Sequence, residues 1–77
     1  MAAELSMLKP GEAGTVIAIH ADEDLYHRLA ALGLRVGKRV ELIRRASFSG
    51  PLHLRIGTTD LMMRGDDARK VEINHPA

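Results

Sequence analysis

The sequence predicts a mainly β protein: a small, partly open β-barrel of about five strands with one inserted α-helix. Two observations lead to this fold class. Short segments of apolar or alternating residues are separated by Gly and Pro turn residues, and one segment with helical periodicity lies between the first two of them. About five short strands are too few for a β-sandwich. The chain has 77 residues, which is the length of one small domain. We therefore expect one domain over residues 1–77, with a core of about residues 8–73.

A turn and then a strand are expected near the start of the chain. Pro10 and Gly11 favour a turn, because Pro fixes one φ angle and Gly permits a positive one. Residues 15–19 are β-branched apart from Ala18, which favours a strand over a helix. We expect this strand at residues 14–20, buried largely on both faces.

A helix of about ten residues is expected next, because leucines recur at helical spacing. These are Leu25, Leu29 and Leu32. Asp22 is the expected N-cap, since its carboxylate can accept a hydrogen bond from a backbone N–H of the first turn. Gly33 is expected to end the helix in a left-handed conformation, which would pack Leu34 back on Leu29.

The rest of the chain predicts strands and turns. Alternating apolar residues indicate strands at 39–44, 52–56, 61–64 and 71–73, with one helical turn at 65–69. Residues 57–60 are typical of a hairpin turn. The turn glycines, each interpreted as a backbone requirement, are Gly33, Gly37 and Gly50. The two ends, residues 1–5 and 74–77, are expected to be loose.

Composition excludes several classes of protein. The chain has no cysteine, so it has no disulfide or thiolate site, and no segment approaches the roughly 20 apolar residues of a membrane span. It begins without the pattern of a secretory signal, so we expect a cytoplasmic location without membrane insertion. The sequence contains no Ser-His-acid pattern and no phosphate-binding loop, so we expect a protein that is not an enzyme.

Four motifs follow one another at compatible spacings: LKPGE at residues 8–12, RLAALGLRVG at 28–37, GPL at 50–52 and LMMR at 61–64. Together they resemble the FeoA family, small cytoplasmic proteins of bacterial ferrous iron uptake, over residues 8–73. The resemblance implies an SH3-like barrel with an inserted helix. It also implies an accessory role to FeoB, the membrane ferrous iron transporter with a cytoplasmic G-protein domain.

The surface expected to bind this partner is a groove, because SH3-like barrels bind peptides in grooves between loops. Aromatic residues make up only 3% of the chain, so we expect an aliphatic, adaptable groove instead of one for a Pro-rich ligand. The candidate partner-binding residues are Leu25, Tyr26, Arg28, Phe48 and Met62. A purely structural role is the alternative for Leu29 and Leu32, which would seat the helix on the barrel.

Histidine and acidic side chains near the helix could hold Fe2+ or Zn2+. The candidate ligands are His20, Asp22, Glu23 and His27, of which Glu23 and His27 are four residues apart on one helix face. The chain lacks H-x-x-x-H and H-x-H patterns, and the acids already have a role at the helix start. We therefore expect no required cofactor, and a divalent metal at most on the surface or between two molecules.

Two other functions compete with the accessory role. Residues 35–64 carry seven Lys and Arg against two Asp and Glu, which permits a small nucleic-acid-binding barrel. The scarcity of aromatic residues for base stacking argues against it, so no nucleic acid partner is expected. The same barrel also resembles the C-terminal domain of iron-dependent repressors of the DtxR type, which suggests a metal-sensing module. Exposed Leu and Met residues permit a weak homo-oligomer.

Overall fold

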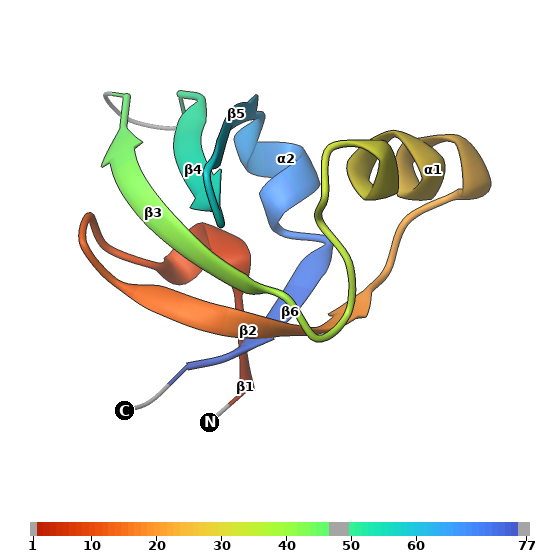
Figure 1. Ribbon diagram of the computed structural model, residues 1–77, viewed down its shortest axis with the longest axis horizontal. Helices are drawn as coiled ribbons and strands as arrows, with labels where there is room; N and C mark the ends of the chain where they lie inside the picture. The colour runs from red at the N-terminus through yellow and green to blue at the C-terminus, as the bar shows by residue number, and fades with distance from the viewer. Residues whose placement is uncertain (1, 47–49, 76–77) are drawn as a thin grey trace.

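The computed structural model describes residues 2–46 and 50–75, and its strands form one curved sheet with helices at its side (Figure 1). In chain order the elements are β1 (Ala2–Glu4), the 3-10 helix η1 (Leu5–Met7), β2 (Ala13–Ile19), α1 (Glu23–Ala31), β3 (Arg39–Arg45), β4 (Leu52–Ile56), β5 (Thr59–Met63), α2 (Gly65–Ala68) and β6 (Val71–Asn74). The mainly β class with one substantial helix is confirmed.

The six strands are all antiparallel and are ordered β1-β6-β2-β3-β4-β5. The sheet has one strand more than expected, because β1 pairs with β6 through Ala3 and Ile73. The prediction that residues 1–5 are loose is therefore wrong for residues 2–5, and Leu5 is fully buried in the core. Within the described residues, β1 and β5 are the two edges of the sheet, which leaves the barrel partly open.

Strand β2 is buried on one face, not on both as its sequence suggested. Val16 is opposite Ile73 and Ala18 is opposite Glu72, so Ile17 is an extra residue that forms a β-bulge. The side chain of Ile17 is 41% exposed. A run of β-branched residues cannot reveal this bulge, because the extra residue is defined by the register with β6.

A second bulge in β3 separates two neighbouring arginines. Leu42 is opposite Leu54 and Arg44 is opposite His53, with the register shifting between them. After the shift, Arg44 lies on the outer face of the sheet, and Arg45 lies on the face of the buried Leu52. The Nη2 atom of Arg45 donates to the carbonyl oxygens of residues 6 and 8, at 2.6 and 2.7 Å. Arg45 therefore attaches β3 to the segment after β1.

Helix α1 begins and ends as its sequence predicts. The Asp22 side chain accepts a hydrogen bond of 2.8 Å from the Leu25 N–H. At the other end, Gly33 has a φ of 96°, its N–H donates to Ala30, and the Leu34 N–H donates to Leu29 at 2.9 Å. These are the two hydrogen bonds of a Schellman motif. The motif places the fully buried Leu34 in the core and directs the chain back towards the sheet.

Two of the three leucines of the predicted stripe seat α1 on the core. Leu25 and Leu29 are buried, whereas Leu32 is the C-cap residue and is 46% exposed. The expectation that Leu32 also seats the helix is therefore wrong. The helix ends one residue before Leu32, so this side chain leaves the buried stripe and becomes part of the surface.

Strands β4 and β5 form a hairpin with a two-residue loop at Gly57 and Thr58. Gly57 has a φ of 61°, which the first loop position of a type I′ or II′ turn requires. The loop is shorter than the predicted turn, because Thr59 and Asp60 already pair with Ile56 and Arg55. The hairpin brings Asp60 and Arg55 to directly opposite positions.

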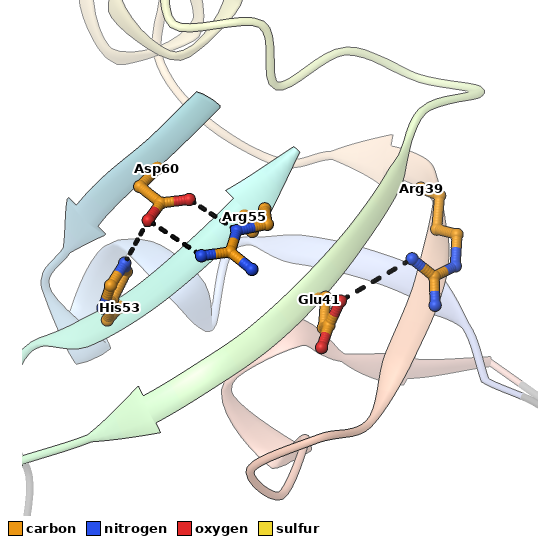
Figure 2. Close-up of polar contacts among 5 residues, drawn as sticks. All are labelled: Arg39, Glu41, His53, Arg55 and Asp60. Atoms are coloured by element: carbon orange, nitrogen blue, oxygen red, sulfur yellow. Dashed lines mark hydrogen bonds and ion pairs between the residues drawn. The ribbon is translucent and has the colours of Figure 1, made fainter. Parts of the chain in front are cut away.

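Asp60 joins two side chains of β4 on the outer face of the sheet (Figure 2). Arg55 donates from Nε to Asp60 Oδ1 at 2.7 Å and from Nη2 to Oδ2 at 3.2 Å, and His53 Nε2 lies 3.0 Å from Oδ2. The hydrogen bonds from Arg55, and then the one with His53, lower the pKa of Asp60 to about 2. Within β3, Oε1 of Glu41 lies 3.9 Å from Nη1 of Arg39.

Strand β6 passes unusually close to β2 at Gly14. A Cβ atom on residue 14 would lie 2.8 Å from Cδ1 of Ile73 and 2.9 Å from the carbonyl oxygen of Asn74. The second of these atoms belongs to the backbone and cannot rotate away. Gly14 is therefore required by the approach of β6 and not by a special backbone angle.

Replacing Gly14 by Ala should destabilise the fold by about 1–3 kcal/mol, because the new methyl group overpacks the contact between β2 and β6. Urea unfolding followed by circular dichroism measures this change. Thr15→Ala, at an exposed position of the same strand, is the control and should lower the midpoint less, because it loses only the strand preference of threonine. Equal midpoints for Gly14→Ala and the unchanged chain would show that β6 does not approach β2 as closely as described.

Replacing Asp60 by Asn should lower the free energy of unfolding in a pH-dependent way. The folded pKa of about 2 lies below the ordinary value of 3.8, so the stabilisation by the ionised carboxylate is complete above pH 3.8 and is lost as the pH falls through about 2. The difference between Asp60→Asn and the unchanged chain should therefore shrink over this range. Urea unfolding at a series of pH values measures it, with Asp66→Asn as a control whose Arg69 contact is longer, 3.4 Å. A difference that stays constant with pH would contradict this expectation.

Candidate functional site

A groove of about 210 Å³ lies between α1 and β5. One wall is α1, which projects from the side of the molecule away from the two chain ends in Figure 1. The other wall is the edge strand β5 with the start of α2. The lining residues are Leu25, Arg28, Leu29, Leu32, Leu61, Met62, Met63, Arg64 and Asp67. Most of these side chains are aliphatic.

Two large apolar side chains of this groove are exposed to solvent. Leu32 is 46% exposed and Met62 is 64% exposed, whereas Leu25 and Leu29 form the buried floor below them. Their exposure costs free energy that burial against a partner would recover, at about 25 cal/mol per Å² of apolar surface. The flexible thioether of Met62 also adapts to the shape of a partner.

Two of the residues that line the groove are arginines. Among the described residues, no ion pair or side-chain hydrogen bond is found for Arg28 or Arg64, and Arg44 on the outer sheet face shares this property. The other arginines all have acceptors: Arg35 on Ala30, Arg39 on Glu41, Arg45 on two carbonyls, Arg55 on Asp60 and Arg69 on Asp66. Much of the predicted basic stretch is therefore engaged within the fold.

The structure brings three of the five candidate partner-binding residues together. Leu25, Arg28 and Met62 line the groove. Tyr26 is exposed on α1 but does not line the groove, and its ring lies edge-on to that of His27 with centroids 6.0 Å apart. Phe48 lies outside the described residues. Sequence reasoning missed the lining by Leu61, Met63 and Arg64, because nothing in the sequence places β5 beside α1.

The candidate metal ligands lie in separate places. His20 Nε2 is 3.1 Å from Glu72 Oε1 on β6, whereas Glu23 and His27 form their own pair on α1 at 3.6 Å. The Asp22 carboxylate caps the helix. In residues 2–46 and 50–75, no group of three or more His, Cys, Asp or Glu side chains is arranged to hold a metal ion. A metal centre within one chain therefore has no support in this part of the molecule.

A wider, shallower hollow of about 320 Å³ lies at the other end of the sheet, beside β1 and β6. Its charged lining is mixed, with Glu4 and Glu72 against His20 and Arg69. Two of these groups, His20 and Glu72, already contact each other. The hollow was not foreseen, because the sequence gives no sign that residues 2–4 form a strand.

The FeoA domain model matches residues 3–75. A curated relative, assigned as Fe(2+) transport protein A in Campylobacter jejuni, is 24% identical over 70 residues, which cover 91% of this chain and 95% of the relative. In the part of the chain that the structure describes, none of the helices has the length and apolar character needed to span a membrane.

Solved FeoA structures have the same fold. The FeoA protein of Chlorobium tepidum superposes with a TM-score of 0.89 at 28% identity, over 97% of this chain and 71% of that protein. FeoA of Stenotrophomonas maltophilia, described as a procaryotic SH3 domain protein and solved in complex with zinc, gives a TM-score of 0.80 at 25% identity, over 94% and 89% of the two chains. The FeoA domain model matches nearly the whole chain, from β1 to β6, and this chain therefore belongs to the FeoA family.

Proposed function

We propose that the chain is a cytoplasmic, non-enzymatic accessory protein that binds the cytoplasmic part of the FeoB transporter and promotes Fe(II) uptake. Membership of the FeoA family supports a role in ferrous iron transport. The observation that carries the binding role is the aliphatic groove between α1 and β5, with Leu32 and Met62 exposed at its rim. A protein partner that covers these side chains would bury apolar surface that the chain alone leaves in water.

The distribution of arginines supports a protein partner over a nucleic acid. A nucleic-acid surface needs several cations that are free to contact successive phosphates. Here Arg39, Arg45 and Arg55 are already held by acceptors of the fold. The cations that remain at the groove stand beside aliphatic side chains, an arrangement suited to a protein surface with apolar and acidic groups.

We further propose that the accessory role needs no resident metal and that Fe(II) is the cargo of the transporter. Two observations support this. The Asp22 carboxylate is used by the helix cap, and the remaining candidate ligands are divided between the His20–Glu72 contact and the Glu23–His27 pair. The exposed Glu23–His27 pair offers two donors, fewer than the four of a closed zinc site.

Replacing Met62 or Leu32 by Gln should weaken binding to FeoB about tenfold each, corresponding to about 1.4 kcal/mol, because each change removes an apolar contact of the groove. Isothermal titration calorimetry with FeoB in lipid nanodiscs measures the affinity. Val36→Gln is the matched control, because Val36 is 57% exposed and does not line the groove.

The outcomes separate the two parts of this proposal. Unchanged affinity of Met62→Gln and Leu32→Gln, with normal binding of the unchanged chain, would show that the transporter binds another face. Absence of any binding by the unchanged chain would contradict the accessory role itself. Fe(II) uptake by cells that carry each variant in place of the chromosomal copy gives the corresponding functional readout.

A further inference from the structure

Strand β5 has backbone groups that no strand of the described sheet uses. Of the strands in residues 2–46 and 50–75, it pairs with β4 alone, and β4 pairs with β3 on its other side. The two-residue loop makes Ile56 and Thr59 a hydrogen-bonded pair, so hydrogen-bonded and non-hydrogen-bonded pairs alternate from there. The N–H and C=O groups of Asp60 and Met62 therefore point away from β4. An unpaired strand edge of this kind can pair with another extended chain.

The groove lies along this free edge. Leu61 and Met63 point to the buried face of the sheet and Met62 points to the opposite face, yet all three line the groove. A hollow that contacts both faces of a strand must pass its edge. Helix α1 forms the other wall, with Leu25 and Leu29 at the floor. An extended segment laid against β5 would therefore have an apolar cavity beside it.

The charge of the groove indicates what kind of segment fits. Arg28 is on the α1 wall and Arg64 directly follows β5, and neither has a partner among the described residues. Asp60, the acid of this strand, is already paired with Arg55 and hydrogen-bonded with His53. Among the described lining residues, Asp67 is the one acid and Arg28 and Arg64 are the two cations, so the net charge of the lining is positive. A carboxylate on the incoming segment would be attracted here.

Resting on the proposed function, we propose that β5 takes up an extended, acidic and apolar segment of the partner as an added antiparallel or parallel strand. The segment pairs with the free backbone groups of Asp60 and Met62, places an apolar side chain in the groove, and places a carboxylate against Arg28 and Arg64. This is recognition by β-strand addition, in which backbone bonds supply affinity and side-chain pockets supply specificity. A second copy of the chain fits less well, since it would bring two sets of unpaired arginines together.

Selection from a random library of displayed nine-residue peptides tests this inference on the full-length chain. The enriched sequences should carry apolar residues at alternate positions with Asp or Glu beside them, and they should be depleted of Lys and Arg. Failure to enrich any sequence, or enrichment of sequences that are basic, Pro-rich or free of acids, would overturn the proposal.

The mode of binding is then tested with the enriched peptide itself. Methylation of its alternate backbone nitrogens, which removes the hydrogen bonds to β5 and leaves every side chain in place, should weaken binding at least tenfold. Arg28→Gln and Arg64→Gln should each weaken binding about five- to tenfold at low salt and less at high salt. Arg44→Gln is the matched control, an exposed arginine on the outer sheet face that does not line the groove. Equal binding of the methylated peptide, or equal loss in Arg44→Gln, would overturn the proposal.

Failure of this inference is distinguishable from failure of the proposed function. If FeoB binds the chain and competes with no enriched peptide, the accessory role stands and strand addition at β5 is wrong. If enriched peptides bind β5 as described and FeoB does not bind, the recognition mode stands and the partner is another protein. Sedimentation of the chain alone checks the remaining occupant: a dimer that Met62→Gln dissociates would assign the β5 edge to a second copy instead.

Discussion

The pairing of β6 with both β1 and β2 holds the two ends of the chain in one sheet, and the other elements depend on it. A chain of 77 residues without cysteine has no disulfide to stabilise it, so its stability depends on its hydrophobic core. Because that core is small, the loss of one strand would remove a substantial part of it. Gly14 allows Ile73 to approach closely enough to close this core. Strand β2, held by β6, leads into α1 along the chain and pairs with β3, which connects it through β4 to β5. Helix α1 and strand β5 are the two walls of the groove, so the position of both depends on β2.

Elements whose signals act over a few residues could be predicted from the sequence. The Asp22 carboxylate caps α1 by accepting a bond from the Leu25 N–H, and the helix ends at Gly33 through bonds that reach back three and five residues, so both ends were marked locally. Strand β1 has no such mark, since Ala2–Glu4 is extended because β6 lies beside it. The bulge at Ile17 depends in the same way on a partner far along the chain. The sequence therefore did not predict the features that depend on how distant strands pair with one another.

In the candidate site, too, some residues could be predicted from local sequence patterns and others could not. Leu25 and Arg28 could be placed on one surface from helical periodicity, whereas Met62 was a candidate because of its flexible apolar side chain. The contributions of Leu61, Met63 and Arg64 depend on the packing of β5 beside α1, which no local pattern encodes. Whether an arginine is available to a partner also depends on residues that are not its neighbours in the sequence. Arg55 is engaged because a two-residue loop places Asp60 directly opposite, whereas Arg64, just beyond the same hairpin, is left for other contacts.

The bulge in β3 has a consequence for how relatives are compared. If β3 were regular, with Ile43 paired to β4 like its neighbours, Arg44 would lie on the inner face and Arg45 on the outer face, because side chains alternate along a strand. One added residue thus decides which of two identical side chains anchors the N-terminal segment and which is solvated. An alignment that matches arginines by type alone would equate an anchor with a surface residue. In this strand, structural equivalence follows the pairing with β4, in which Arg44 lies opposite His53 and Arg45 lies opposite Leu52.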